Sequence, residues 1–128
     1  MIIKSLELTN FRNYDSLSIQ FDKGTNILYG DNAQGKTNIL EAIHLSATTK
    51  SHKGSKDRDI IQFGREEGHI RTYLEKDGME VKVDMHLRNS KSKVIAINGQ
   101  KIKKASELLG ILNVVLFSPE DLSIIKNG

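Results

Sequence analysis

The 128-residue chain has no cysteine, no tryptophan and a single proline, Pro119. Without cysteine it forms no disulfide and offers no thiolate to a metal ion, which fits a reducing compartment. It also lacks an apolar run of ~18 residues and the layout of a signal peptide, so we expect neither membrane insertion nor secretion. These absences predict a cytoplasmic protein without a membrane partner.

What remains is the composition of a folded domain. Hydrophobic residues make up 38% of the chain, which is enough to bury one core, and a single domain is the expectation at this length. With one proline and no low-complexity stretch, the chain has no candidate linker. Its formal net charge of +3 at pH 7 permits contact with nucleic acid but does not require it.

One short segment carries most of the functional information. Residues 30–37 read GDNAQGKT and match the phosphate-binding P-loop pattern G-x-x-x-x-G-K-[ST] at every fixed position. Residues 26–29, just upstream, read as a short buried strand. Downstream, apolar residues at helical spacing predict a helix whose apolar face is formed by Ile39, Leu40, Ile43 and Ala47. Strand, glycine-rich loop and helix in this order favour binding of the polyphosphate of a nucleotide.

The chemistry of the loop assigns roles to its residues. Gly30 and Gly35 permit backbone angles and close approaches that a Cβ would prevent, so successive N–H groups can surround the β-phosphate. Lys36 is long enough to reach the β- and γ-phosphate oxygens, and the Thr37 hydroxyl is a ligand for Mg²⁺. The cofactor-binding residues predicted for this segment are Gly30, Asp31, Asn32, Ala33, Gln34, Gly35, Lys36, Thr37 and Asn38.

The sequence around the P-loop predicts further strands. Residues 2–9 read as a strand, residues 10–15 as a turn, and residues 17–21 as a second, half-buried strand. After the P-loop helix, residues 49–59 are polar and basic without periodicity, which predicts a loop. Inward positions in the first strand are predicted for Ile3, Leu6 and Leu8.

The second half of the chain has a different pattern. Apolar and polar residues alternate over about 68–102, and this stretch is interrupted by Asp77-Gly78 and Asn98-Gly99, two strong signals for tight hairpin turns. We therefore expect an antiparallel β element there. Residues 103–110 read as helical, and the apolar run 113–117 as a strand covered on both faces. A further helix is expected to begin at Ser118, with a proline at its first position.

Three blocks in this order resemble the RecF family of bacterial recombination-repair ATPases, relatives of the SMC and ABC ATPases. They are the opening LTNFRNY at 8–14, the extended P-loop segment GDNAQGKTNILEAI at 30–43, and LFSPEDL at 116–122. The resemblance covers all 128 residues, which correspond to about the first third of a family member. It implies an α/β P-loop NTPase of ABC/SMC type, with a mixed sheet around the P-loop helix plus the antiparallel β element. Residues 1–128 would then be one N-terminal ATPase lobe, part of a longer protein, with a P-loop core at 1–50 and 113–128.

The resemblance also implies a function. RecF-like proteins bind ATP with Mg²⁺, bind DNA at single-strand/double-strand gap junctions, form an ATP-dependent homodimer, hydrolyse ATP slowly, and act with RecO and RecR in loading the recombinase. In the family, the signature motif, the Walker B acids and a switch histidine follow residue 128, so we expect the isolated chain to lack hydrolytic competence. The alternative is a P-loop kinase or another enzyme of nucleotide metabolism. The β segments before the P-loop and the hairpin-rich region favour the repair ATPase.

Further site residues follow from the resemblance. Family relatives contact the nucleotide phosphates from the turn that holds Arg12 and Asn13, and a guanidinium suits a bidentate phosphate contact. The basic loop after the P-loop helix becomes a candidate for DNA contact through Lys50, Lys53, Lys56 and Arg58, because family members bind DNA. A second basic run, Lys101, Lys103 and Lys104, is a weaker candidate. Neither run has interleaved aromatic residues that would indicate base stacking, and a solvated surface is the alternative for both.

Overall fold

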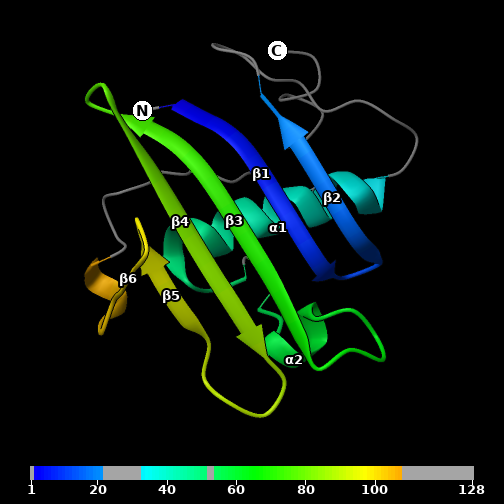
Figure 1. The fold of residues 1–128 in the computed structure, drawn as a ribbon. Helices are drawn as coiled ribbons and strands as arrows, with labels where there is room; N and C mark the ends of the chain where they lie inside the picture. Colours follow the sequence, from blue (N-terminus) through cyan, green and yellow to red (C-terminus); the bar gives the residue numbers. More distant parts are fainter. Residues whose placement is uncertain (1, 22–32, 52–53, 108–128) are drawn as a thin grey trace.

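A computed structural model describes residues 2–21, 33–51 and 54–107 of the chain (Figure 1). Its elements, in chain order, are β1 (Ile2–Phe11), β2 (Tyr14–Gln20), α1 (Ala33–Thr48), α2 (Asp57–Ile60), β3 (Glu67–Lys76), β4 (Met79–Arg88), β5 (Val94–Ile97), β6 (Gln100–Lys101) and the 3₁₀ turn η1 (Ala105–Glu107). The elements predicted at 26–29 and 113–117 and from Ser118 onward lie outside the described residues.

All strands in the described part of the chain belong to one six-stranded sheet, in the order β2-β1-β3-β4-β5-β6, and every pairing is antiparallel. Because β1 pairs with both β2 and β3, the strands before the P-loop and the antiparallel element of 68–102 form one continuous sheet.

Both predicted hairpin turns are present. Asp77 and Gly78 have φ of +54° and +78°, and Asn98 and Gly99 have φ of +51° and +84°. Two successive positive φ values match the right-handed twist of a hairpin, and Asn-Gly and Asp-Gly tolerate them best. The turn between β3 and β4 fixes the register of ten residue pairs, so one turn orders two of the three ten-residue strands of the sheet.

The first two strands are longer than predicted. β1 runs to Phe11 and β2 begins at Tyr14, so the turn expected at 10–15 is confined to two residues. A register shift between Ile3 and Ser5 changes the alternation in β1. This bulge explains why the odd-numbered Ile3 packs against the core together with the fully buried Leu6 and Leu8.

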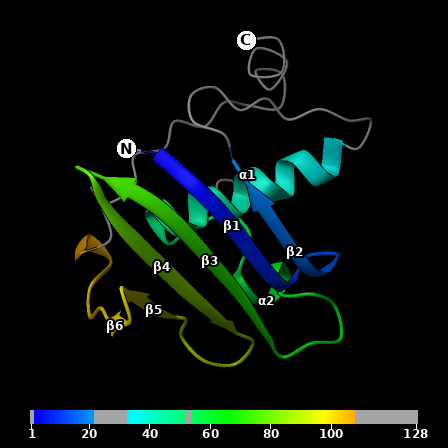
Figure 2. The ribbon, with the colours of Figure 1, turned by 45° about the horizontal axis from the view of Figure 1, so that its top comes forward.

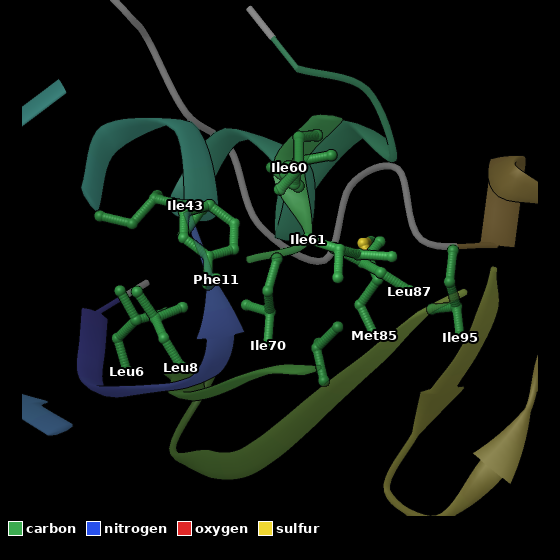
Figure 3. Packing of buried hydrophobic residues seen from close by; sticks show 14 of the residues in the cluster. Leu6, Leu8, Phe11, Ile43, Ile60, Ile61, Ile70, Met85, Leu87 and Ile95 are labelled. Atoms are coloured by element: carbon green, nitrogen blue, oxygen red, sulfur yellow. The ribbon is translucent and has the colours of Figure 1, made fainter. Parts of the chain in front are cut away.

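Both helices lie on one face of the sheet, and the main core fills the space between (Figures 1 and 2). In Figure 3, Phe11 at the end of β1 points toward α1, where Ile43 projects. The buried face of α1 differs from the predicted one: Ile43 and Ala47 are buried as expected, but Ile39 and Leu40 are only half-buried. The fully buried side of the helix is instead partly polar and consists of Asn38, Glu41, Ala42, Leu45 and Ser46.

The segment predicted as a loop at 49–59 ends in the one-turn helix α2. The helix is too short for a periodic pattern, although its acidic first turn suits a helix N-terminus. Ile60 and the following Ile61 are buried in the core. Backbone hydrogen bonds attach the segment to the end of β1, because the Arg12 N–H donates to the Ile60 carbonyl at 2.7 Å.

The opposite face of the sheet is charged, and its cations are paired with acids. Arg71 Nε donates to Asp84 Oδ1 at 2.6 Å, and Lys4 Nζ donates to Glu80 Oε1 at 2.9 Å. Lys82 Nζ lies 3.8 Å from Asp84 Oδ2. In the described residues, no helix is long and apolar enough to cross a membrane.

We predict that Gly68→Ala destabilises the fold. A Cβ at this buried position of β3 would lie 2.8 Å from the backbone oxygen of Asn10, so the two strands would have to separate. The free energy of unfolding should fall by about 1–3 kcal/mol, as for an overpacked core. Urea denaturation of the variant and of Ser18→Ala, a matched change on exposed β2, would measure this. Equal midpoints for Gly68→Ala and wild type would contradict the prediction.

Candidate nucleotide site

The P-loop pattern coincides with the beginning of α1. Ala33, Gln34, Gly35, Lys36 and Thr37 form the first turns of the helix backbone, whereas Gly30, Asp31 and Asn32 lie outside the described residues. The first turn of this 16-residue helix contains no acidic residue. Its free N–H groups and the positive end of its dipole therefore face the loop that precedes it, which favours binding of an anion there.

Asn38 connects the helix to the turn after β1. Its side chain is 1% exposed, and its amide nitrogen donates to Asn13 Oδ1 over 3.4 Å. Asn13 itself is exposed at the turn between β1 and β2. Two residues predicted to bind the cofactor are thus brought together, although 25 positions separate them in the sequence.

Arg12, in the same turn, has a left-handed backbone with φ of +53°. Its guanidinium forms a bidentate contact with the carboxylate of Glu41 on α1: Nε donates to Oε1 and Nη2 to Oε2, each at 2.9 Å. Nη1 also donates to the Asp59 carbonyl at 3.1 Å, and Nη2 donates to Ser55 Oγ at 2.9 Å. Most N–H donors of the Arg12 guanidinium are thus used within the protein. Its contact with a nucleotide phosphate stays a prediction, based on the position of Arg12 beside the cavity.

Glu41 is the residue that sequence reasoning missed. Its side chain is fully buried, with an exposed fraction of 0%, and it also accepts a hydrogen bond from Ser51 Oγ in the segment after α1. The only signal in the sequence is its spacing: it lies three residues after Asn38 and four after Thr37, on the same side of the helix. An acid among apolar residues of a helix is more often read as solvent-facing, so the pattern alone did not single it out.

A cavity of about 910 Å³, lined mostly by polar and charged residues, opens beside these residues. It is lined by Arg12, Asn13, Asp15, Asn38, Arg58, Asp59, Ile61, Gln62, Phe63 and Arg65. Its volume is in the range of small-molecule and cofactor sites, and the amides and arginines are suitable partners for an anionic ligand. Phe63 is a fully exposed aromatic side chain at the rim, which the sequence reasoning also did not select.

The residues predicted to contact DNA lie between the end of α1 and α2. Arg58, on α2, lines the cavity just described. Lys50 is exposed just after the end of α1, and Lys56 is exposed at the N-cap of α2. Lys53 lies outside the described residues. Among the residues that are described, no group of three His, Cys, Asp or Glu side chains is arranged to hold a metal ion.

The fold and the site together define a P-loop NTPase of the type found in SMC and RecF proteins. The AAA domain family matches residues 5–124, and the chain belongs to that family. Along all 128 residues it is similar to the DNA replication and repair protein RecF of Agathobacter rectalis, at 68% identity, and of Lachnoclostridium phytofermentans, at 66%. It covers 35% and 36% of these two proteins, so the chain spans about a third of the length of the curated relatives it matches.

Solved structures of RecF and SMC proteins also resemble this chain. The chain is similar to the recombination mediator protein RecF-ATP of the RecFOR pathway, with a TM-score of 0.85 and 40% identity over 98% of this chain and 35% of that one. It also resembles an Smc head bound to the C-terminal winged-helix domain of ScpA, with a TM-score of 0.75 and 27% identity over 94% of this chain and 42% of that one.

We predict that Arg12→Ala destabilises the protein, because the fully buried Glu41 carboxylate loses its cationic partner. Breaking a buried ion pair typically costs about 3–5 kcal/mol, and the 21% exposure of the Arg12 side chain places the expected loss near the lower limit. Chemical denaturation would measure it, with Arg65→Ala at the same cavity as the control, which should change stability by less than about 0.5 kcal/mol.

A double-mutant cycle with Glu41→Gln isolates the pair. Because a neutral glutamine no longer needs the guanidinium, the double variant should be less destabilised than the sum of the two single variants. Strict additivity would show that Arg12 and Glu41 do not stabilise each other.

Proposed function

We propose that this chain is the ATP-binding lobe of a DNA recombination-repair ATPase. The observation that carries the proposal is the complete P-loop pattern at the start of α1, next to a cavity large enough for a nucleotide. The likeness to a RecF-ATP structure at 40% identity supports ATP as the nucleotide. The names of the relatives, which describe DNA replication and repair, support the wider role.

In this proposal each part of the site has a separate task. The loop backbone of residues 30–35 and the first N–H groups of α1 surround the β-phosphate, and Lys36 reaches the β- and γ-phosphate oxygens. Thr37 supplies a hydroxyl ligand to Mg²⁺, which when bound neutralises phosphate charge. Asn13 and Asn38 line the cavity beside the helix and offer amide groups to the ligand.

The proposal extends to the complete protein. Residues 1–128 would be one lobe, with a P-loop core at 1–50 and 113–128, of a longer cytoplasmic protein that forms a homodimer when ATP binds. DNA at gap junctions, RecO and RecR would be its partners, and its role would be to help load a recombinase. Contact with DNA is proposed for Lys50, Lys53, Lys56 and Arg58. Hydrolysis stimulated by duplex DNA would distinguish this function from that of a P-loop kinase, which would instead transfer phosphate to a small acceptor.

We predict that Lys36→Ala weakens ATP binding tenfold to a hundredfold or more, because charged hydrogen bonds of this kind are typically worth about 1.5–3 kcal/mol. Isothermal titration calorimetry with ATP and Mg²⁺ would measure the dissociation constant. Lys91→Ala, an exposed lysine of the loop between β4 and β5, is a control that should bind ATP like wild type. An unchanged affinity of the Lys36 variant would rule out the P-loop assignment.

We also predict that a polypeptide of residues 1–128 releases no phosphate from ATP above background. The segment holds the predicted phosphate cradle, whereas the family groups that orient the attacking water and close over the γ-phosphate are expected beyond it. A steady-state phosphate-release assay, with the same polypeptide carrying Lys36→Ala as the blank, would test this. Turnover that disappears in the blank would show that the lobe alone is catalytic.

A further inference from the structure

The two basic runs of the sequence are joined in space by Lys93. Its ammonium group, just before β5, lies 2.9 Å from Asp57 Oδ1 at the start of α2. It also donates a hydrogen bond to the backbone carbonyl of Thr49, at the end of α1. With 21% and 25% exposure, Lys93 and Asp57 form a partly buried pair that fixes β5 and its neighbour β6 against the segment that follows α1.

Beside this contact, at the β5–β6 end of the sheet, lies a second cavity of about 380 Å³. Its lining is formed by Thr49, an apolar floor of Val94, Ile95 and Ile102, and the lysines at 93, 101, 103 and 104. Among the described residues, the lining includes no acidic and no aromatic side chain. Lys50 directly follows Thr49, so the two basic runs, about 50 positions apart in the sequence, adjoin at one place.

These lysines differ from the cations of the sheet. Lys4, Arg71 and Lys82 each lie within ion-pair distance of an acid. In the part of the chain that the structure describes, no such partner exists for the exposed side chains of Lys50, Lys101, Lys103 and Lys104.

A neighbouring acid, Glu107, is already engaged by the backbone. The carboxylate of Glu107 accepts hydrogen bonds from the N–H groups of Lys104, at 2.9 Å, and of Lys103, at 2.7 Å. These bonds lower the pKa of Glu107 and hold its charge at the 3₁₀ turn. Lys103 and Lys104 are exposed to solvent, where they are accessible to an external anion.

We propose that this lysine edge, defined as Lys50, Lys101, Lys103 and Lys104, binds the phosphate backbone of duplex DNA. The inference rests on the proposed function for the class of partner and adds where on the fold it binds. Several lysines of one edge without an acidic partner among the described residues suit a polyanion, and a described lining without aromatic side chains favours phosphates over stacked bases. Lys93 is the positioning residue, because its own charge is neutralised by Asp57 while it holds the edge together.

The test is a salt titration of duplex binding by the full-length protein with ATP, using two duplexes of unrelated sequence. The variant Lys101→Gln/Lys103→Gln/Lys104→Gln should bind both duplexes more weakly by the same factor. The slope of log affinity against log salt should become shallower by about 2–3, since each phosphate contact contributes about 0.9. ATP affinity should stay unchanged, because the P-loop is not altered. All three side chains are exposed, so the fold should be preserved.

The matched control is Lys4→Gln/Lys76→Gln/Lys82→Gln, which removes the same net charge elsewhere on the sheet, and it should retain the wild-type slope. An equal change in the control and the edge variant would overturn the proposal, because net charge alone would then explain it. A wild-type slope in the edge variant would also overturn it and leave the proposed function intact. Failure of the proposed function would look different: the wild-type protein itself would bind neither ATP nor duplex DNA.

Discussion

The contact between Arg12 and Glu41 organises the candidate site. A carboxylate with no exposure to water is stable in its charged form only with a close partner, and the bidentate guanidinium at 2.9 Å supplies it. Through the same guanidinium, the turn after β1 is attached to α1, to Ser55 and to the Asp59 carbonyl. The position of Asn13 beside Asn38, and the shape of the adjoining cavity, depend on this junction.

The sheet provides the rigid support for that junction. β1 lies between β2 and β3 and ends at the buried Phe11, so the turn carrying Arg12 projects from a strand paired along both edges. On the other side of the core, α1 is held partly by polar contacts, including the hydrogen bond at 2.8 Å between the buried hydroxyls of Ser46 and Thr72. Polar burial of this kind, with every partner satisfied, favours a single packing of helix on sheet.

Charge divides the surface into regions with different potential roles. On the face of the sheet opposite α1, acids and bases neutralise one another across neighbouring strands, as Arg71 and Asp84 do. At the β5–β6 end, Lys101, Lys103 and Lys104 have no such partner among the described residues, so their positive charge is not neutralised locally. A net charge of only +3 therefore conceals a local excess, which is the quantity that matters for attracting a polyanion.

Local features could be predicted from the sequence: the P-loop at the start of a helix, the two Gly-containing hairpin turns and the alternating strands of 68–102, since each depends on residues close together in the chain. The sequence did not determine the role of Glu41, the one-turn helix α2 or the joining of the two lysine runs. Those features arise from contacts between residues 10 to 44 positions apart, such as Glu41 with Ser51, Arg12 with Glu41, and Lys93 with Thr49. Only the folded chain brings such residues together, because no periodicity or motif encodes which distant side chain will neutralise a buried charge.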